Sequence, residues 1–317
     1  SSAASDVYKR QEYYHGEPSS YTIRRDKLDH ILLEACKELK NSTVLEEHKA
    51  ISIDYSDNGV TLLTKDKIIE AKMVIVASGC NTSLASRYNL NKKDDDHFAM
   101  GLRGYFENVK MSDEAFSELY LNLETFLGGF YISALGNNKF NVNMVMKKGS
   151  VMFQKLKFRE HFFNHINAHP ILKEKFKDAK LVGALEGHGL MLGTINRELS
   201  KDNMLFVGDS AGLIDVVTAN GIPQAMKSAK IAAQKTVEAI NSNNFKHSFL
   251  KNYDKEVYKA LKKSLRSGRI FNIFYRTESS YKIALKITDL LFKYKLVDKF
   301  LKIGVYGISF KKRTVKK

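Results

Sequence analysis

The chain has 317 residues, of which 44% are hydrophobic and 27% charged, a balance typical of globular proteins and sufficient for two domains. Its two cysteines, Cys36 and Cys80, exclude a disulfide scaffold and a cysteine metal quartet, and they favour a reducing compartment. No apolar run approaches the roughly 20 residues that a membrane-spanning helix needs.

The net charge of +16 is concentrated near the C-terminus, because residues 246–317 hold 20 lysines and arginines against 5 acidic residues. Three interpretations fit this basic tail: contact with anionic lipid headgroups, nucleic-acid binding, or a solvated basic face. Nucleic acid is the least favoured of the three.

The first eleven residues, SSAASDVYKRQ, match in full the in-frame translation of a common transposase-type sequencing adapter. We therefore expect Ser1–Gln11 to be an artefact and exclude it from the fold. The natural sequence is then expected to begin near Glu12 and to lack its true N-terminus, so no signal peptide can be assessed.

The N-terminal third predicts a helix, a hairpin and a buried strand. Residues 24–40 carry apolar side chains at helical spacing. Residues 50–55 and 60–64 flank the sequence DNG, which predicts a β-hairpin with a tight turn. The apolar run AKMVIVASG over 71–79 predicts a strand buried on both faces, as in a parallel sheet.

The middle of the chain predicts a mixed sheet with a covering helix. Strands are expected over 100–109, 129–135 and 140–146, with a turn at Asn137-Asn138, and 151–180 is mostly helical. Tyr105 and Tyr131 could line a cavity, although core packing is the favoured role for both.

His161, His165 and His169 recur every four residues and therefore share one helix face. Such spacing can seat a metal ion, but no acidic or cysteine partner accompanies it. A solvated histidine stripe is the favoured interpretation, and no metal is expected.

The segment LFVGDSAGLIDVVTANGI over 205–222 predicts a buried strand, a glycine turn and a helix start. A carboxylate at the carboxyl end of such a strand, Asp209, faces the crevice where α/β sheets bind ligands, and it can accept hydrogen bonds from ribose or ribityl hydroxyls. Gly212 permits close backbone approach or a positive φ, and Gly221 and Ile222 offer amides and a helix dipole to an anion. The alternative is an ordinary α/β crossover with a capping aspartate.

This segment resembles the flavin-binding GD motif of the geranylgeranyl reductase family, which is similar to p-hydroxybenzoate-hydroxylase-like flavoproteins. The matching residues are Val207, Gly208, Asp209, Ser210, Ala211, Gly212, Gly221, Ile222, Ala225, Met226, Ser228, Ala232 and Ala233. Val216, Ala219 and Asn220 depart from the motif's proline, glycine and glutamate.

Three further blocks resemble the family in the same order. Arg25 stands where the family's R-x-x-F-D arginine contacts the cofactor, although a solvated helix-start charge is the alternative. VIVASGCN over 74–81 is similar to a strand end near the cofactor, and Ala50 falls near the position that meets the adenine side. Residues 127–143 resemble a hairpin that lines the substrate cavity, where Gly128 matches and Tyr131 replaces a tryptophan.

The resemblance implies a mixed α/β (α+β) fold. Residues 12–92 and 201–245 would form a Rossmann-like FAD-binding domain lacking its first βαβ unit, since no G-x-G-x-x-G occurs in the chain. Residues 93–200 would form an antiparallel-sheet substrate domain, and 246–317 a basic helical tail. The chain as written is therefore expected to bind FAD weakly or not at all.

The function implied is that of an FAD-dependent oxidoreductase that reduces C=C bonds of an isoprenoid or other apolar substrate, with NAD(P)H or another donor reducing the flavin. No catalytic residue is assigned, and the family's reactive cysteine does not map to Cys36 or Cys80. The alternatives are a flavin-dependent monooxygenase or halogenase of the same fold, and a non-catalytic membrane-surface or nucleic-acid binding protein. A cytoplasmic location is expected, peripheral at the inner membrane face in the lipid interpretation.

Overall fold

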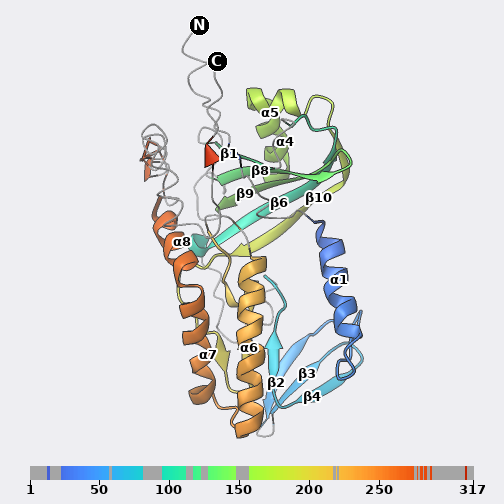
Figure 1. The fold of residues 1–317 in the computed structure, drawn as a ribbon, viewed down its shortest axis with the longest axis vertical. Coiled ribbons are helices and arrows are strands. Elements are labelled where there is room, and N and C mark those ends of the chain that lie inside the picture. The colour runs from blue at the N-terminus through green and yellow to red at the C-terminus, as the bar shows by residue number, and fades with distance from the viewer. Residues whose placement is uncertain are drawn as a thin grey trace.

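The computed structural model describes residues 23–56, 59–80, 95–111, 117–122, 128–147, 157–216 and 221–274, together with a few short pieces: 13–14, 219, 277, 279–280, 282–283, 286–287 and 311–312. A five-stranded antiparallel sheet crosses one half of the molecule, with two short helices above it (Figure 1). The other half holds two three-stranded sheets and the long helices α6 and α7, while α1 runs along the opposite side from α7 (Figure 1).

The large sheet has the strand order β10-β6-β9-β8-β7. Its strands are β6 (Phe98–Glu107), β7 (Ser117–Asn122), β8 (Gly128–Gly136), β9 (Lys139–Lys147) and β10 (Lys180–Met191). The predicted hairpin between β8 and β9 is confirmed, because Asn137 and Asn138 have φ of 50° and 57°, as a type I′ turn requires.

Helices α4 (Phe158–Ala168) and α5 (Pro170–Lys175) cover one face of this sheet. Phe130, Ile132 and Phe162 are fully buried between the strands and the helices. Of the helix predicted over 151–180, residues 151–156 lie outside the described residues, and the last residue begins β10 instead.

The three predicted histidines lie on the inner face of this helical layer, and the expectation of a solvated stripe is wrong. Only 8% of His161, 1% of His165 and 5% of His169 is exposed. The His165 ring centroid lies 5.5 Å from that of Phe130 on the sheet beneath. The four-residue spacing correctly predicted that the three histidines share one face, but that face is apolar and turned toward the sheet.

The second half is built around a parallel strand pair. β5 (Val74–Val76) pairs in parallel with β12 (Met204–Phe206), and β11 (Ser200–Lys201) joins β12. The prediction of a parallel strand near residue 75 is confirmed, but burial on both faces is not, because Ile75 is 39% exposed.

The remaining predicted elements form close to where the sequence placed them. They are α1 (Arg25–Lys37), the hairpin β2 (Ser52–Ser56) with β3 (Gly59–Leu63), α6 (Ile222–Ser242), α7 (His247–Ala260) and α8 (Lys262–Phe274). The predicted turn at Asp57-Asn58 lies outside the described residues, and strand β4 (Ile68–Ala71), which pairs with β3, was not predicted. Helix α6 begins with a proline in its first turn and ends at Asn243 in the left-handed conformation, as helix start and stop signals predict.

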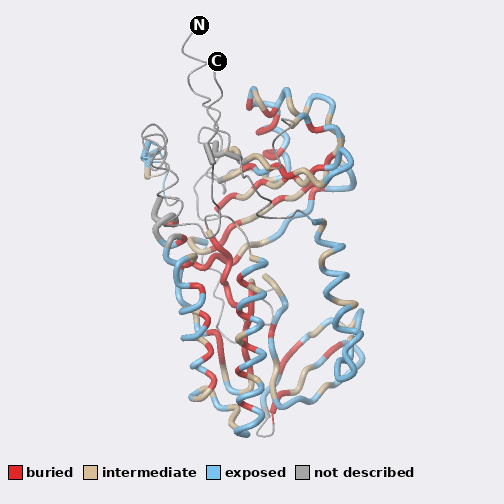
Figure 2. Tube along the Cα trace, viewed as in Figure 1, coloured by how far each residue is buried: buried red, intermediate tan, exposed pale blue. Residues whose placement is uncertain are grey.

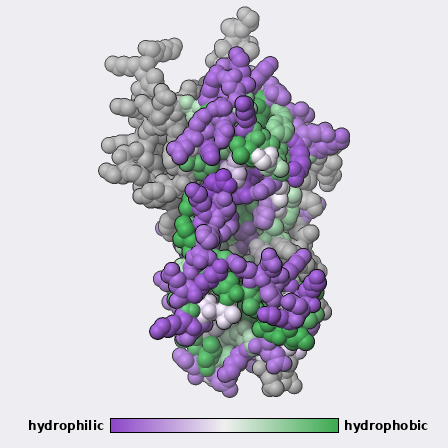
Figure 3. Space-filling view, turned by 90° about the vertical axis from the view of Figure 1, so that its right-hand side faces the viewer, coloured by the Kyte–Doolittle hydropathy of each residue, from purple (hydrophilic) through white to green (hydrophobic). Residues whose placement is uncertain are grey.

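Each half has a core of buried residues, whose positions along the Cα trace are red in Figure 2. The core of the second half joins β5, β12, α6 and α7 through Phe206, Ala232 and Tyr253, which are at most 1% exposed. Helix α1 has no buried residue, and its apolar Ile31 and Leu32 are exposed. Figure 3 shows one face of the molecule, on which hydrophobic patches lie among hydrophilic side chains. Among the described residues, no helix is both long and apolar enough to cross a membrane.

Candidate flavin and substrate site

The carboxyl ends of the two parallel strands bring two turns together. Gly208-Asp209 follows β12 directly, and Gly79-Cys80 follows β5 three residues after its last strand position. Ligands of open α/β sheets bind at this edge, where the strands end and the chain turns away. This edge is therefore the candidate site.

Small residues and hydroxyls hold the turn after β12 in place. Gly208 has a φ of 58°, and a Cβ on it would lie 2.9 Å from the Cβ of Ala225 on α6. Its backbone N–H donates to the buried Ser228 hydroxyl at 3.0 Å. The Ser210 hydroxyl lies 2.6 Å from the carbonyl oxygen of Val76 and so joins the turn to β5. Helix α6, the turn and β5 are thus fixed to one another.

Asp209 is partly buried at this turn, and its carboxylate touches the start of α6. A Cβ built on Gly221 would lie 2.7 Å from Asp209 Oδ1, so only glycine lets the two approach this closely. Burial raises the pKa of Asp209, while the nearby His188 and Arg25 lower it. Among the described residues, none donates a hydrogen bond to this carboxylate, which leaves it able to accept bonds from a ligand.

The start of α6 adds a positive electrostatic end beside Asp209. Gly221 is the N-cap of this helix of 21 residues, and no side chain caps it. Ile222, its first residue, is 37% exposed. A helix dipole and backbone amides at such a position attract negative charge.

Gly212, another predicted cofactor residue, has a structural reason to be glycine. Its φ is 64°, and a Cβ there would lie 2.6 Å from Arg197 Nη1. That guanidinium group donates to the carbonyl oxygen of Leu192 at 3.0 Å and ties the turn to the end of β10. Of the two predicted reasons for Gly212, the positive φ is the one observed.

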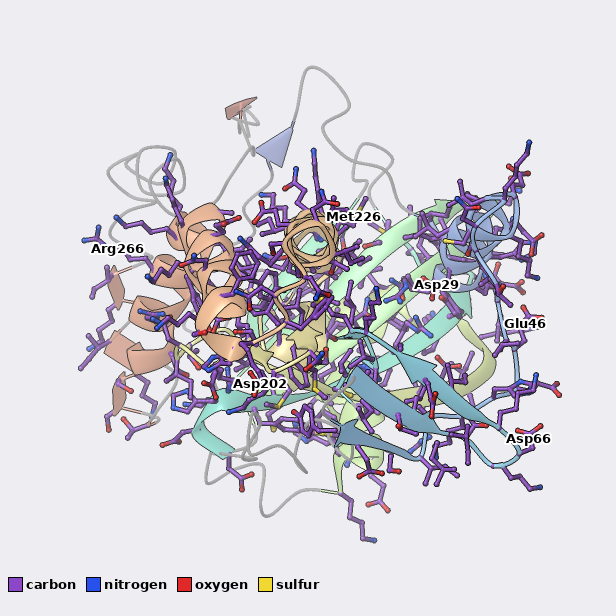
Figure 4. All side chains as sticks on the ribbon, turned by 90° about the horizontal axis from the view of Figure 1, so that it is seen from below. Asp29, Glu46, Asp66, Asp202, Met226 and Arg266 are labelled. Carbon is purple, nitrogen blue, oxygen red and sulfur yellow. The ribbon has the colours of Figure 1, made fainter. Side chains whose placement is uncertain are left out.

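The start of α1 approaches from the other side. Arg25 is ion-paired with Asp29 at 3.1 Å on the exposed helix face, and it lies near enough to Asp209 and His188 to lower the pKa of both. Figure 4 labels Asp29 on this helix. The preceding Arg24 stacks over the Tyr105 ring of β6 at 4.7 Å, which joins α1 to the large sheet.

One face of the large sheet is turned toward this site and away from α4 and α5. A row of paired residues crosses it from Tyr131 through Asn143 and Arg103 to Glu186. Tyr131 is 39% exposed, so core packing, its favoured role, is wrong, and the tyrosine lies on the exposed face of the sheet. Gly128 lies at the start of the same strand, opposite Met146.

Sequence reasoning missed two residues of the site. His188 lies on β10, a strand that was not predicted, on the exposed face of the sheet. Its Nε2 atom lies 3.3 Å from the Sγ atom of Cys80, to which the sequence analysis gave no functional role. Ala50, predicted near the adenine side, lies just before β2 and packs against the core of the second half. No group of three or more metal-ligating side chains occurs among the described residues.

Two kinds of known protein are similar to this chain in sequence. The chain matches no protein-family model. It is 25% identical over 245 residues to a digeranylgeranylglycerophospholipid reductase of Methanococcus vannielii, covering 75% of this chain and 60% of that protein. It is 22% identical over 259 residues to a pyrrole-2-carbonyl carrier-protein chlorinase of Pseudomonas fluorescens, covering 77% of this chain and 56% of that protein.

Solved structures place the fold. A geranylgeranyl bacteriochlorophyll reductase-like protein from Thermoplasma acidophilum superposes with a TM-score of 0.69 at 21% identity, over 81% of this chain and 65% of that one. The halogenase PltM in complex with FAD gives a TM-score of 0.62 at 15% identity, over 81% of this chain and 55% of that one. The chain is therefore a relative of the digeranylgeranylglycerophospholipid reductases and has the Rossmann-like fold of FAD-binding oxidoreductases and halogenases.

Proposed function

We propose that the chain carries the flavin end and the substrate face of an FAD-dependent oxidoreductase that reduces C=C bonds of an isoprenoid or other apolar substrate. The observation that carries this proposal is the partly buried Asp209 carboxylate, held against the glycine start of α6. Residues 12–92 and 201–245 would then serve the cofactor, and 93–200 the substrate.

The residues at this edge fit a flavin. Asp209 would accept hydrogen bonds from ribityl hydroxyls, which would offset the cost of keeping a carboxylate partly buried. Gly221 and Ile222, at the positive end of α6, would hold the edge of the flavin ring that becomes negative on reduction. Arg25 would add positive charge from α1. A bound flavin supplies hydride for addition to a double bond, after reduction by NAD(P)H or another donor.

The substrate would lie against the exposed face of the large sheet. Tyr131 offers aromatic surface there, as expected for an apolar ligand. The isoprenoid class follows from the name of the digeranylgeranylglycerophospholipid reductases, not from a pocket of this chain.

Titration of the chain with riboflavin, FAD and ADP tests the flavin proposal. Because the contacts described lie at the flavin end, riboflavin and FAD should bind with similar, weak affinity, and ADP should not bind. Asp209→Asn and Gly221→Ala should each weaken binding about tenfold, the loss of one or two hydrogen bonds to a charged group. Asp66→Asn, at an exposed carboxylate in the β3–β4 turn, is the matched control.

Isothermal titration calorimetry measures each affinity, because it does not require a fluorescent ligand. Binding that ADP reproduces, or binding that does not depend on Asp209, would contradict the proposal. So would the absence of any flavin binding at millimolar concentration.

A flavin-dependent halogenase or monooxygenase is the second candidate function, and the chlorinase relative supports it. The two functions differ in their need for oxygen, because a hydroxylase or halogenase consumes oxygen to make product and a reductase does not. Product formation under strict anaerobiosis therefore supports the reductase. Oxygen-dependent product supports the alternative.

We also propose that the basic tail contacts an anionic lipid surface. Lys251, Lys255 and Lys259 recur every four residues on the exposed face of α7, and Arg266 extends outward from α8 (Figure 4). Each such cation near an anionic membrane contributes about 1 kcal/mol. A lipid substrate would make this contact useful, since it brings the enzyme to its substrate.

A further inference from the structure

A turn after β5 and the strand β10, which are far apart in the sequence, bring a thiol and an imidazole into contact. The Cys80 Sγ atom lies 3.3 Å from His188 Nε2, and the two residues are 108 positions apart. Gly79, with a φ of 68°, turns the chain after β5 and places Cys80 at the sheet edge. His188 extends from the exposed face of β10, so the pair is open to solvent from the sheet side.

The surrounding charges favour transfer of the thiol proton to the imidazole. The hydrogen bond to His188 is the main cause that lowers the pKa of Cys80, against opposing effects of burial and of Asp209. The same bond raises the pKa of His188, where Asp209 assists and Arg25 opposes. A thiol in contact with an imidazole, with a carboxylate that interacts with the imidazole, is the arrangement of an activated cysteine nucleophile.

We propose that Cys80 and His188 form a nucleophilic pair that makes Cys80 a site of covalent modification by small disulfides. In this reaction the Cys80 sulfur attacks one sulfur of the disulfide and forms a new S–S bond. The disulfide's own S–S bond breaks, and its other half leaves as a thiolate that takes up a proton from solvent. The disulfide is the only oxidant needed, and the proposal does not depend on flavin binding.

The chain has two cysteines, which allows a clean comparison between them. Cys36→Ser leaves Cys80 as the single thiol, and Cys80→Ser leaves Cys36, which is exposed on α1. Dithiodipyridine is the probe disulfide, because it reacts with thiolates at acidic pH and releases a coloured thiopyridone. At pH 6, Cys80 in the folded chain should react about tenfold faster than Cys36, since a lowered pKa increases the fraction of reactive thiolate at this pH.

His188→Gln in the Cys36→Ser background should slow this reaction about tenfold, whereas His30→Gln, at an exposed histidine on α1, should leave it unchanged. Concentrated urea should abolish the difference between the two thiols, because the pair exists only in the folded chain. Equal rates for the two thiols in the folded chain would overturn the proposal.

A second measurement covers the case in which His188→Gln disturbs the sheet. In the Cys36→Ser variant, the rate should fall by clearly less than tenfold per pH unit between pH 8 and 6, because the hydrogen bond to His188 lowers the pKa of Cys80. An ordinary thiol loses about tenfold in rate per pH unit over this range. A tenfold loss per unit at Cys80 would overturn the proposal without any histidine variant.

Discussion

Acidification should destabilise the fold through the buried histidines of α4, and His165 gives the magnitude. Burial is the largest cause that lowers the pKa of His165 to about 4, from an ordinary 6.5, and the neighbouring His169 and His161 contribute to this shift. Above pH 6.5 the imidazole is neutral in both the folded and the unfolded chain, so it does not affect stability. Between pH 6.5 and about 4 the unfolded chain binds a proton that the folded chain does not.

The free energy of unfolding should therefore fall as pH drops through this window, and level off below about pH 4. Because one pKa unit is worth about 1.4 kcal/mol, the loss from His165 alone should approach about 3 kcal/mol. Urea titrations at pH 7.5 to 4.5 measure it. His165→Leu should remove most of this dependence, since leucine fills a similar volume and cannot be protonated.

His30→Gln is the matched control. The His30 side chain is 69% exposed, so this substitution should leave the pH dependence of stability unchanged. Carboxylates such as Asp254, whose pKa burial raises, titrate in both proteins and cancel in the comparison. Equal pH dependence in the wild type and in His165→Leu would refute the reasoning. Direct titration of the His165 imidazole by NMR would then show whether its pKa or its burial was misjudged.

Two further predictions concern packing and lipid binding. Gly104→Ala should lower the free energy of unfolding by about 1–3 kcal/mol in urea titrations, because the added Cβ would lie 2.7 Å from Leu185 and 2.8 Å from Phe106; unchanged stability would mean that these side chains move aside freely. The chain should sediment with phosphatidylglycerol vesicles but not with phosphatidylcholine vesicles, and Lys255→Glu with Lys259→Glu should weaken this binding at least about tenfold. Equal binding to both kinds of vesicle would contradict the electrostatic interpretation.

Local signals in the sequence predicted the elements that depend on local chemistry. The Asn137-Asn138 turn predicted the β8–β9 hairpin, and Pro223 lies in the first turn of helix α6, where a proline is tolerated. The GD turn was also predictable, because its glycines are required where they stand: Gly208 by a positive φ and by contact with Ala225. Such positions need no knowledge of the rest of the fold.

Strand β10 escaped prediction for a physical reason. Its sequence, KLVGALEGHGLM, contains three glycines, which lower strand propensity. The structure shows what one of them provides: a Cβ on Gly189 would lie 2.5 Å from the Phe98 ring on β6. Gly189 thus weakens the strand signal in the sequence, and its lack of a side chain is also what lets β10 pair beside Phe98 of β6.

The incomplete prediction of the site follows from the same cause. Asp209 and Gly221 are close in sequence and could be predicted together, whereas Cys80 and His188 meet only because β10 pairs with β6 and β5 pairs with β12. A periodic pattern also shows which residues share one face of a helix, but not whether that face is turned toward the core or toward solvent. For this reason the histidines of α4 were expected in solvent. Their direction is decided by Phe130 and the other buried side chains of the sheet beneath. Reactive and titrating groups that strand pairing brings together can thus be recognised only once the fold is known. This holds even where each strand-end motif is visible in the sequence.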